Sequence, residues 1–213
     1  MKKLLLFVVL IITIITLINI SKNSLPEAIT NGNASAPNIL LVNQANSLPF
    51  DYNATGLINL YEQKNRSFEL DDTDIKMCEV AYKAMQKMFY EASKENVTDF
   101  VITSGYRTKE KQQEIYKNAK KGQAAKPGES EHQTGLAFDV MTNNSGVKFE
   151  NTFHCKWLIQ NCAKYGFILR YPKGKERITG FPYEPWHFRY VGTPHSETIM
   201  REGITLEEYL GAI

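Results

Sequence analysis

SEHQTGLAFDV at residues 130–140 and EPWHFRY at residues 184–190 are the two stretches that indicate the fold most directly. In both, apolar and polar side chains alternate, and a period of two is that of a half-buried strand. The sequence therefore predicts strands at Leu136–Met141 and Trp186–Tyr190. Each strand would turn its apolar side chains to one face and its polar side chains to the other.

Further elements follow from hydrophobic spacing and from residues that begin or end helices. Thr108 is placed to cap one helix, and Gly166 to end another. The order of elements indicates an α+β fold, in which a small, mostly antiparallel sheet is backed by helices. The other predicted elements are a long helix at Asp71–Lys94, a short buried strand at Phe100–Thr103, and helices at Thr108–Ala119 and Thr152–Tyr165.

Three separated residues, His132, Asp139 and His187, have the side chains of a metal site. Two imidazoles and one carboxylate leave one position of a tetrahedral Zn²⁺ open, which is typical of catalytic sites and not of structural ones. A lone buried Asp or His would be costly, and a shared cation supplies the missing partner. Glu184, just upstream of His187, is placed to act as a general base. The pattern predicts zinc-assisted hydrolysis.

A second chemistry fits part of the same pattern. Ser130, His132 and Asp139 are the residue types of a nucleophilic hydrolase triad. However, Ser130 lacks the Gly-x-Ser-x-Gly turn of many serine hydrolases, and a triad would leave Glu184 and His187 without a role. We therefore favour the metal site over the serine nucleophile.

Length, charge and cysteine content limit the class of protein. The chain has 213 residues, 43% of them hydrophobic and 23% charged, which suits one globular domain with a substantial core. Its net charge of +2 equals that of Lys2 and Lys3, so we expect no basic face for nucleic acid. Cys155 and Cys162 would lie ~10 Å apart along a predicted helix, too far for a disulfide. With Cys78, they are expected to be small buried residues.

The N-terminus is predicted to meet a membrane. Two lysines precede an apolar stretch at residues 4–20, an order typical of a secretory signal or a membrane anchor. As a helix this stretch would span ~25 Å, just short of the ~30 Å hydrocarbon core. The nearest small-residue cleavage site, Ala-Ser-Ala at 34–36, lies far downstream, so we favour an uncleaved anchor over a secreted form. The predicted organisation is an anchor or signal segment at 1–22, a flexible spacer at 23–39, and a catalytic domain at 40–213 outside the cytoplasm.

The stretches at residues 130–140 and 184–190 also resemble the sequence motifs of a known family. The chain resembles the VanY-type D-alanyl-D-alanine carboxypeptidases, in the fold group that also holds lysostaphin-type peptidases and the hedgehog signalling domain. The patterns Ser-x-His-x-x-Gly-x-Ala-x-Asp, from Ser130 to Asp139, and Glu-Pro-Trp-His, from Glu184 to His187, are specific to it. The resemblance runs from about residue 41 nearly to the C-terminus. Its further segments are Leu41–Asn43, Leu48–Pro49, Asp51–Tyr52, Ser104–Arg107, Pro127–Glu129, Gly166–Pro172 and Phe188–Gly192.

This resemblance implies Zn²⁺ held by His132, Asp139 and His187, with Glu184 as the base. It implies that Arg107 contacts the substrate and stabilises developing charge, for which a guanidinium fork is better suited than a lysine. The implied substrate is a peptidoglycan stem peptide that ends in D-Ala-D-Ala, and no protein partner is expected. The residues implied for the terminal D-alanine subsite are Gln112, Ser130 and Tyr171.

Two other functions remain open from the sequence. An L,D-carboxypeptidase of the same fold would trim tetrapeptide stems, and the two activities differ in pocket shape around the penultimate residue. A zinc-stabilised module that binds the cell wall without catalysis is a third possibility. The presence of Glu184 beside a complete ligand set argues against this module.

Overall fold

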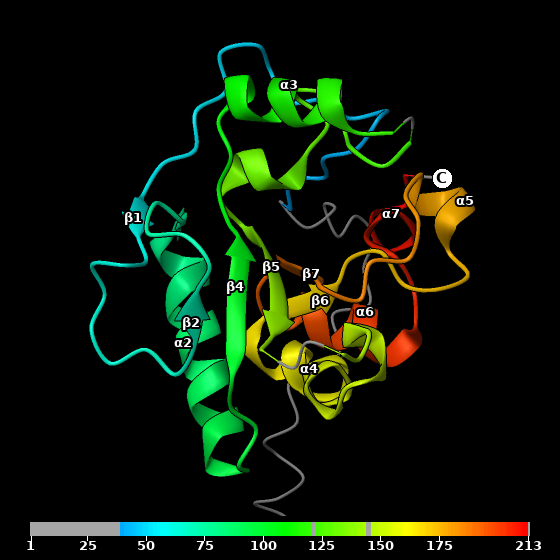
Figure 1. Ribbon diagram of the computed structural model, residues 1–213. Coiled ribbons are helices and arrows are strands. Elements are labelled where there is room, and N and C mark those ends of the chain that lie inside the picture. Colours follow the sequence, from blue (N-terminus) through cyan, green and yellow to red (C-terminus); the bar gives the residue numbers. More distant parts are fainter. Residues whose placement is uncertain (1–38, 121, 144–145, 213) are drawn as a thin grey trace, which may run out of the picture. The chain divides into compact units, whose positions relative to one another are not determined.

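A five-stranded sheet forms the centre of the fold (Figure 1). The computed structural model describes residues 39–120, 122–143 and 146–212. The strand order is β2-β4-β5-β7-β6, with β2 parallel to β4 and the other neighbours antiparallel. The predicted α+β fold with a small, mostly antiparallel sheet is confirmed. Its strands are β2 (Glu69–Leu70), β4 (Phe100–Ser104), β5 (Ala137–Thr142), β6 (Phe167–Leu169) and β7 (His187–Tyr190).

The register between β5 and β7 brings the two opening stretches of sequence together. Asp139 pairs directly with His187, and Phe138 pairs with Phe188. Side chains opposite one another in an antiparallel pair have Cβ atoms ~5 Å apart. The sheet by itself therefore sets the spacing of Asp139 and His187. The strands predicted around these residues are confirmed to within one residue at each end.

Helices and short 3-10 turns surround the sheet (Figure 1). The predicted cap of α3 is present, since the Thr108 side chain accepts a hydrogen bond from the backbone N–H of Lys111. A second, two-stranded sheet pairs β1 (Leu57–Asn59) with β3 (Lys76–Cys78). The helices are α2 (Glu79–Lys94), α3 (Lys109–Asn118), α4 (Phe153–Asn161), α5 (Glu176–Thr179), α6 (His195–Glu202) and α7 (Leu206–Leu210), and the 3-10 turns are η1 (Glu131–Thr134), η2 (Phe149–Asn151) and η3 (Cys162–Tyr165).

One face of the sheet carries the main hydrophobic core. Phe138 and Phe188 are fully buried there and belong to one cluster with side chains of α2 and α4. The ring of Phe89, on α2, lies 6.0 Å from that of Phe138 between centroids. Because strand side chains alternate, Asp139 and His187 project from the opposite face. The core thus fixes the two strands that present these polar residues.

The predicted helix at Asp71–Lys94 is wrong in its first part. Lys76–Cys78 forms β3, and α2 begins only at Glu79. The backbone of this segment is paired across to β1, so its polar groups are satisfied without a helix. The spacing of apolar residues did not reveal this pairing, because the partner strand lies upstream. Met85 and Phe89, which lie one helical turn apart on α2, are fully buried.

The three cysteines are free and buried, which confirms the prediction that they are small buried residues and that Cys155 and Cys162 are not bridged. Burial raises the pKa of Cys155 to about 11 and that of Cys162 to about 12. Both side chains therefore remain thiols at neutral pH and pack as small apolar groups.

The N-terminal predictions lie outside the residues that the structure describes. These are the anchor at 1–22 and all but the last residue of the spacer at 23–39. In the part of the chain that is described, none of the helices combines the length and the apolar character needed to span a bilayer.

Candidate metal centre

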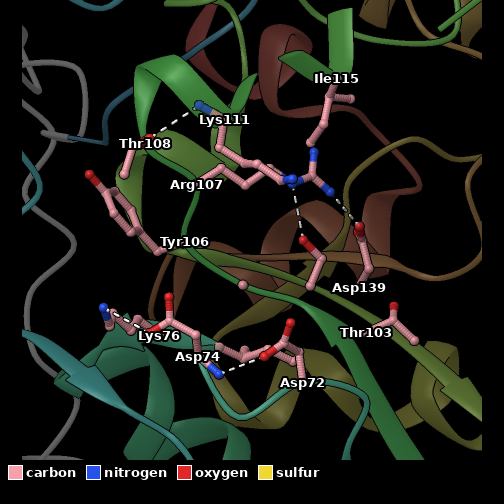
Figure 2. A pocket seen from close by; sticks show the side chains of 13 residues that line it. Asp72, Asp74, Lys76, Thr103, Tyr106, Arg107, Thr108, Lys111, Ile115 and Asp139 are labelled. Atoms are coloured by element: carbon pink, nitrogen blue, oxygen red, sulfur yellow. Dashed lines mark hydrogen bonds and ion pairs between the residues drawn. The ribbon is translucent and has the colours of Figure 1, made fainter. Parts of the chain in front are cut away.

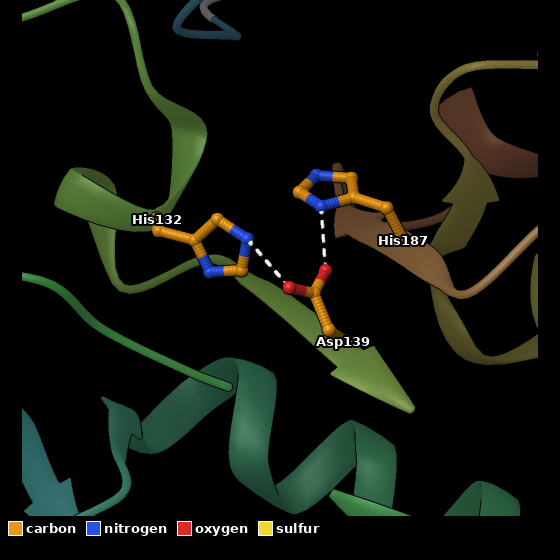
Figure 3. A group of neighbouring side chains, drawn as sticks. All are labelled: His132, Asp139 and His187. Carbon is orange, nitrogen blue, oxygen red and sulfur yellow. Dashed lines mark hydrogen bonds and ion pairs between the residues drawn. The ribbon is translucent and has the colours of Figure 1, made fainter. Parts of the chain in front are cut away.

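Three side chains from separate elements converge on the face of the sheet opposite the core (Figure 3). His132 comes from η1, Asp139 from β5 and His187 from β7, and their ligand atoms lie within 4.8 Å of one another. Asp139 lies between the imidazoles, with Oδ2 3.3 Å from His132 Nε2 and Oδ1 2.9 Å from His187 Nδ1. Tetrahedral Zn²⁺ with bonds of ~2.1 Å would space its ligand atoms ~3.4 Å apart. The three residues therefore fit one zinc ion with a position left open.

The second ring nitrogen of each histidine contacts an oxygen. His132 Nδ1 lies 2.7 Å from the carbonyl oxygen of Gly105, and His187 Nε2 lies 3.3 Å from Oε2 of Glu131. Because a carbonyl only accepts, His132 Nδ1 carries the hydrogen and Nε2 turns its lone pair toward Asp139. Contacts of this kind orient the imidazoles of metal sites.

The alternative triad of Ser130, His132 and Asp139 is not formed. Both nitrogens of His132 are engaged, one by Gly105 and the other by Asp139. A serine nucleophile needs a histidine nitrogen within hydrogen-bond reach of its hydroxyl, and His132 has none to offer. The serine reading of the sequence is therefore wrong.

In the absence of a cation, the site holds a proton. Burial works to raise the pKa of Asp139, but His132 and His187 hold it far below its ordinary range. Burial also works to lower the pKa of His187, yet its hydrogen bonds to Asp139 and Glu131 raise it to about 9. His187 is therefore protonated at neutral pH in the metal-free protein. Zinc binding would release this proton, since metal ligation requires a neutral imidazole.

Glu184 lies in the turn that precedes β7. Its side chain lines a cavity that is also lined by the three candidate ligands. Its backbone N–H donates to the carbonyl of Tyr171 at 3.1 Å, and its carbonyl accepts from the N–H of His187 at 3.2 Å. Burial, together with the negative charge of Asp139, raises the pKa of Glu184 to about 7, against the opposing effect of His187. A carboxyl group with a pKa near neutrality can both accept and release a proton during a reaction.

Arg107 reaches the metal centre from the turn that follows β4 (Figure 2). Its Nη2 donates to Oδ2 of Asp139 at 3.1 Å, and its Nε donates to Oγ of Ser104 at 3.0 Å. Burial lowers the pKa of Arg107, although the charges of Asp139 and Glu184 oppose this. Its ion pair is thus with a candidate metal ligand, so Arg107 belongs to the site.

A cavity of about 220 Å³ lies against the three candidate ligands. The three residues implied for the D-alanine subsite, Gln112, Ser130 and Tyr171, all line it. A neighbouring cavity of about 570 Å³ shares Arg107 and Asp139 with the first (Figure 2). The two together form a cleft, and Arg107 and Asp139 lie where the cavities meet.

Neighbouring groups hold Gln112 and Tyr171, two of the residues implied for the subsite. The amide of Gln112 donates to the carbonyl of Ala125 at 2.8 Å and accepts from Arg107 Nη1 at 3.4 Å. The ring of Tyr171 lies 5.0 Å from that of His187 between centroids, and burial raises its pKa well above the ordinary value. Tyr171 therefore keeps its hydroxyl hydrogen at neutral pH, and Gln112 serves first to position Arg107 and the loop at Ala125.

Sequence reasoning missed Glu131, the neighbour of His132. Its side chain is fully buried and bonds to Arg170 and Arg189 as well as to His187. The position of Arg189 could have pointed to Glu131, because the strand period places Arg189 on the same face as His187. A buried arginine needs a counter-charge, and Glu131 adjoins the other histidine of the site.

Fold and site together define a class of protein. An α+β domain that gathers two histidines, an aspartate and a glutamate of raised pKa around a cleft has the parts of a metal-dependent hydrolase. The family described as "VanY: D-alanyl-D-alanine carboxypeptidase" matches residues 74–193. The chain belongs to this VanY family, as its sequence resemblance predicted.

Individual relatives agree with this membership. The D-alanyl-D-alanine carboxypeptidase of Enterococcus faecium is 36% identical over 192 residues, which are 89% of this chain and 63% of the relative. This chain thus spans slightly less than two thirds of that relative's length.

Solved structures of similar fold include members with different specificities. The LdcB LD-carboxypeptidase has a TM-score of 0.70 at 36% identity, covering 81% of this chain and 85% of that one. A variant of the vancomycin resistance D,D-pentapeptidase VanY, in complex with Zn(II), has a TM-score of 0.66 at 34% identity, covering 80% of this chain and 97% of that one.

Proposed function

We propose that this protein is a zinc-dependent D,D-carboxypeptidase that removes the C-terminal D-alanine from peptidoglycan stem peptides ending in D-Ala-D-Ala. One observation carries the proposal above the others. His132, Asp139 and His187 converge within 4.8 Å, and Glu184 lines the cavity that they border. Membership of the VanY family supports the choice of substrate.

His132, Asp139 and His187 would hold the zinc ion. When bound, zinc supplies a Lewis acid, which lowers the pKa of water toward ~7 and polarises a carbonyl group. The chain contributes two neutral imidazoles and one carboxylate, each oriented by a second contact. All three residues line the cavity, so a zinc ion held by them would be within reach of a bound substrate.

Glu184 moves the proton in this mechanism. As a carboxylate it accepts a proton from the attacking water, and as an acid it delivers that proton to the leaving amine. Its raised pKa, about 7 in the metal-free protein, keeps the two forms close in free energy. Glu184 can therefore accept a proton and release it again within one turnover.

Arg107 would stabilise the negative charge that develops on the substrate carbonyl oxygen. Its side chain lines both parts of the cleft, and contacts to Ser104 and Gln112 fix its orientation. From this position the guanidinium can bind a substrate oxygen or the developing oxyanion. Arg107 thus serves as the electrostatic partner of the substrate, while Glu184 handles the proton.

The terminal residue of the substrate would occupy the smaller cavity. A volume of about 220 Å³ admits one small residue, and Gln112, Ser130 and Tyr171 line its wall. The rest of the peptide would lie in the cavity of about 570 Å³ on the other side of Arg107. This division suits an enzyme that removes a single residue from a chain end.

An L,D-carboxypeptidase is the second candidate, because LdcB is similar in sequence and fold. The decisive experiment incubates the purified full-length protein with synthetic pentapeptide and tetrapeptide stems, with and without a zinc chelator, and measures free alanine. Chelator-sensitive release from the pentapeptide alone supports the D,D activity. Release from the tetrapeptide alone supports the L,D activity, and binding of either peptide without release supports a non-catalytic module.

The site of action is part of the proposal. The lysines and apolar residues at 2–20 would anchor the chain in the cell membrane, with residues 40–213 on the outer side, next to peptidoglycan. Mass spectrometry of the mature protein tests this, because an intact N-terminus supports an anchor. Loss of the first residues would instead support a secreted enzyme.

A further inference from the structure

Glu131 is the centre of a cluster of charged side chains that is closed to solvent. Its Oε1 accepts hydrogen bonds from Arg170 Nε and Arg189 Nη1, both at 2.7 Å. Arg170 in turn donates through Nη1 and Nη2 to the two oxygens of Glu207, at 2.9 and 2.6 Å. All four residues are at most 1% exposed. We call Glu131, Arg170, Arg189 and Glu207 the buried charge network; its formal charges balance.

The other oxygen of Glu131 points to the metal centre. Oε2 lies 3.3 Å from Nε2 of His187, and Nδ1 of the same ring lies 2.9 Å from Oδ1 of Asp139. The imidazole is thus held between two carboxylates, one at each nitrogen. If His187 gives its Nδ1 lone pair to a metal, Nε2 carries the ring hydrogen and Glu131 is the group that accepts it.

We propose that Glu131 is a positioning residue for the metal centre, which fixes the orientation and tautomer of His187 so that Nδ1 faces the zinc ion. A carboxylate on the far nitrogen of a ligand histidine also makes that histidine a stronger donor. The arginines hold Glu131 in place, and Glu207 holds Arg170. The inference rests on the proposed zinc site and is independent of which peptide the enzyme cleaves.

The contacts at this position require a carboxylate and not an amide. Three donors meet the side chain of Glu131: two guanidinium N–H groups at Oε1 and the ring N–H of His187 at Oε2. A glutamine has one acceptor oxygen and one NH₂ group, which only donates. It would satisfy either the arginines or the histidine, and its NH₂ would oppose the remaining donor.

The network also fastens distant parts of the chain behind the metal centre. Arg189 Nη2 donates to the carbonyl of Leu40 at 2.7 Å, and Asn43 Nδ2 donates to Oε1 of Glu207 at 3.1 Å. Glu207 belongs to α7, near the C-terminus. Residues at both ends of the described chain therefore stabilise the arginines that hold Glu131.

Zinc affinity in two matched variants tests the proposal. Glu131→Gln and Glu207→Gln each remove one negative charge from the same network, but only Glu131 contacts His187. Competition with a chromogenic chelator should show zinc binding weakened ~10–100-fold in Glu131→Gln, the range typical of lost contacts behind a ligand histidine. Glu207→Gln, which leaves the contact between Glu131 and His187 in place, should lose much less zinc affinity than Glu131→Gln.

The absorption spectrum of the cobalt-substituted protein gives a second readout for the same variants. A reoriented ligand should change the visible bands in Glu131→Gln and leave them unchanged in Glu207→Gln. Urea unfolding in the presence of chelator separates this effect from lost stability, because both variants should be destabilised without metal. Equal losses of zinc affinity in the two variants, or none in Glu131→Gln, would overturn the proposal.

The unmodified chain provides a test that needs no variant to fold. In the zinc-loaded protein with ¹⁵N-labelled histidine, NMR should find His187 coordinated through Nδ1 with its hydrogen on Nε2. His132 should show the opposite arrangement, with its hydrogen on Nδ1. Coordination of His187 through Nε2 would overturn the proposal. None of these measurements uses alanine release, so an inactive chain with this tautomer would contradict the proposed function alone.

Discussion

Two carboxyl groups in the cleft have pKa values shifted in opposite directions. His132 and His187 hold the pKa of Asp139 far down against the effect of burial, whereas burial raises that of Glu184 to about 7. A permanently charged carboxylate suits a metal ligand, and a carboxyl group that titrates near neutrality suits proton transfer. Environment therefore assigns different roles to side chains of the same chemical type.

Replacement of Glu184 by glutamine should abolish proton transfer and leave the metal in place. We expect kcat to fall by at least ~10²-fold, as for loss of a general base, while bound zinc measured by atomic absorption is retained. The surface variant Glu202→Gln makes the same chemical change away from the cleft and should keep full activity. Near-normal turnover in Glu184→Gln would contradict the assigned role.

The raised pKa of Glu184 predicts a pH-dependent difference in stability. Between the ordinary value of 4.5 and the folded value of about 7, the folded metal-free protein binds a proton more tightly than the unfolded chain. Stability contributed by protonated Glu184 is therefore lost as the pH rises through this window. In chelator, Glu184→Gln should match the unmodified protein near pH 4.5 and exceed it at pH 8, by on the order of 2 kcal/mol.

Urea unfolding of both proteins at the two pH values checks this prediction. Titrating groups that do not interact with Glu184 behave alike in the two chains, so their contributions cancel in the difference. A difference that is constant with pH, or that favours the unmodified protein at pH 8, would show that the pKa of Glu184 is not raised.

At the scale of elements, Gly135 links η1, which carries His132, to β5, which carries Asp139. It ends η1 in the left-handed conformation, with φ +70°. An added Cβ would lie 2.8 Å from Cys78 Sγ and 2.8 Å from Leu57 Cδ2. A side chain at this position would therefore be strained by its backbone angle and crowded by its neighbours.

Gly135→Ala should destabilise the fold more than the same change at Gly203. Both glycines have positive φ, but a Cβ at Gly203 would meet nothing within 4 Å. Gly203→Ala should cost about 1–2 kcal/mol for the left-handed conformation, and Gly135→Ala should cost a further ~1–3 kcal/mol for crowding. Chemical denaturation of both variants measures the difference in the free energy of unfolding. Equal losses of stability would show that the side chains next to Gly135 move aside at no energetic cost.

At the scale of the whole molecule, one site joins segments that are far apart in the chain. The candidate ligands come from η1, β5 and β7, and the buried charge network behind them reaches Leu40 and Glu207. A metal ion at this point binds only the folded chain, because the unfolded chain does not hold its ligands together.

Removal of zinc should therefore lower the stability of the whole protein. With free zinc at 100 times its dissociation constant, binding adds ~2.7 kcal/mol to the free energy of unfolding. Thermal unfolding with and without chelator measures this contribution. The variant His187→Ala should lose the dependence on zinc, and if zinc stabilises it as much as the unmodified chain, His187 is not a ligand.

Much of this architecture could be predicted locally. The strands around Asp139 and His187, the cap at Thr108 and the buried stripe of α2 follow from side-chain periods and from capping residues. The start of α2 could not, since residues 76–78 pair with β1. Hydrogen bonding to a distant strand overrode the local helical spacing there.

Local patterns in the sequence are enough to identify the residues that have the chemistry of the site. His132, Asp139, His187 and Glu184 stand in local patterns whose residue types and strand period are independent of the rest of the chain. The use of these residues depends on contacts that form when the chain folds. The register of β5 against β7 pairs Asp139 with His187, and burial behind η1 sets Glu131 against the far nitrogen of His187. Contacts and pKa shifts of this kind depend on groups brought together from distant segments, which no local pattern specifies.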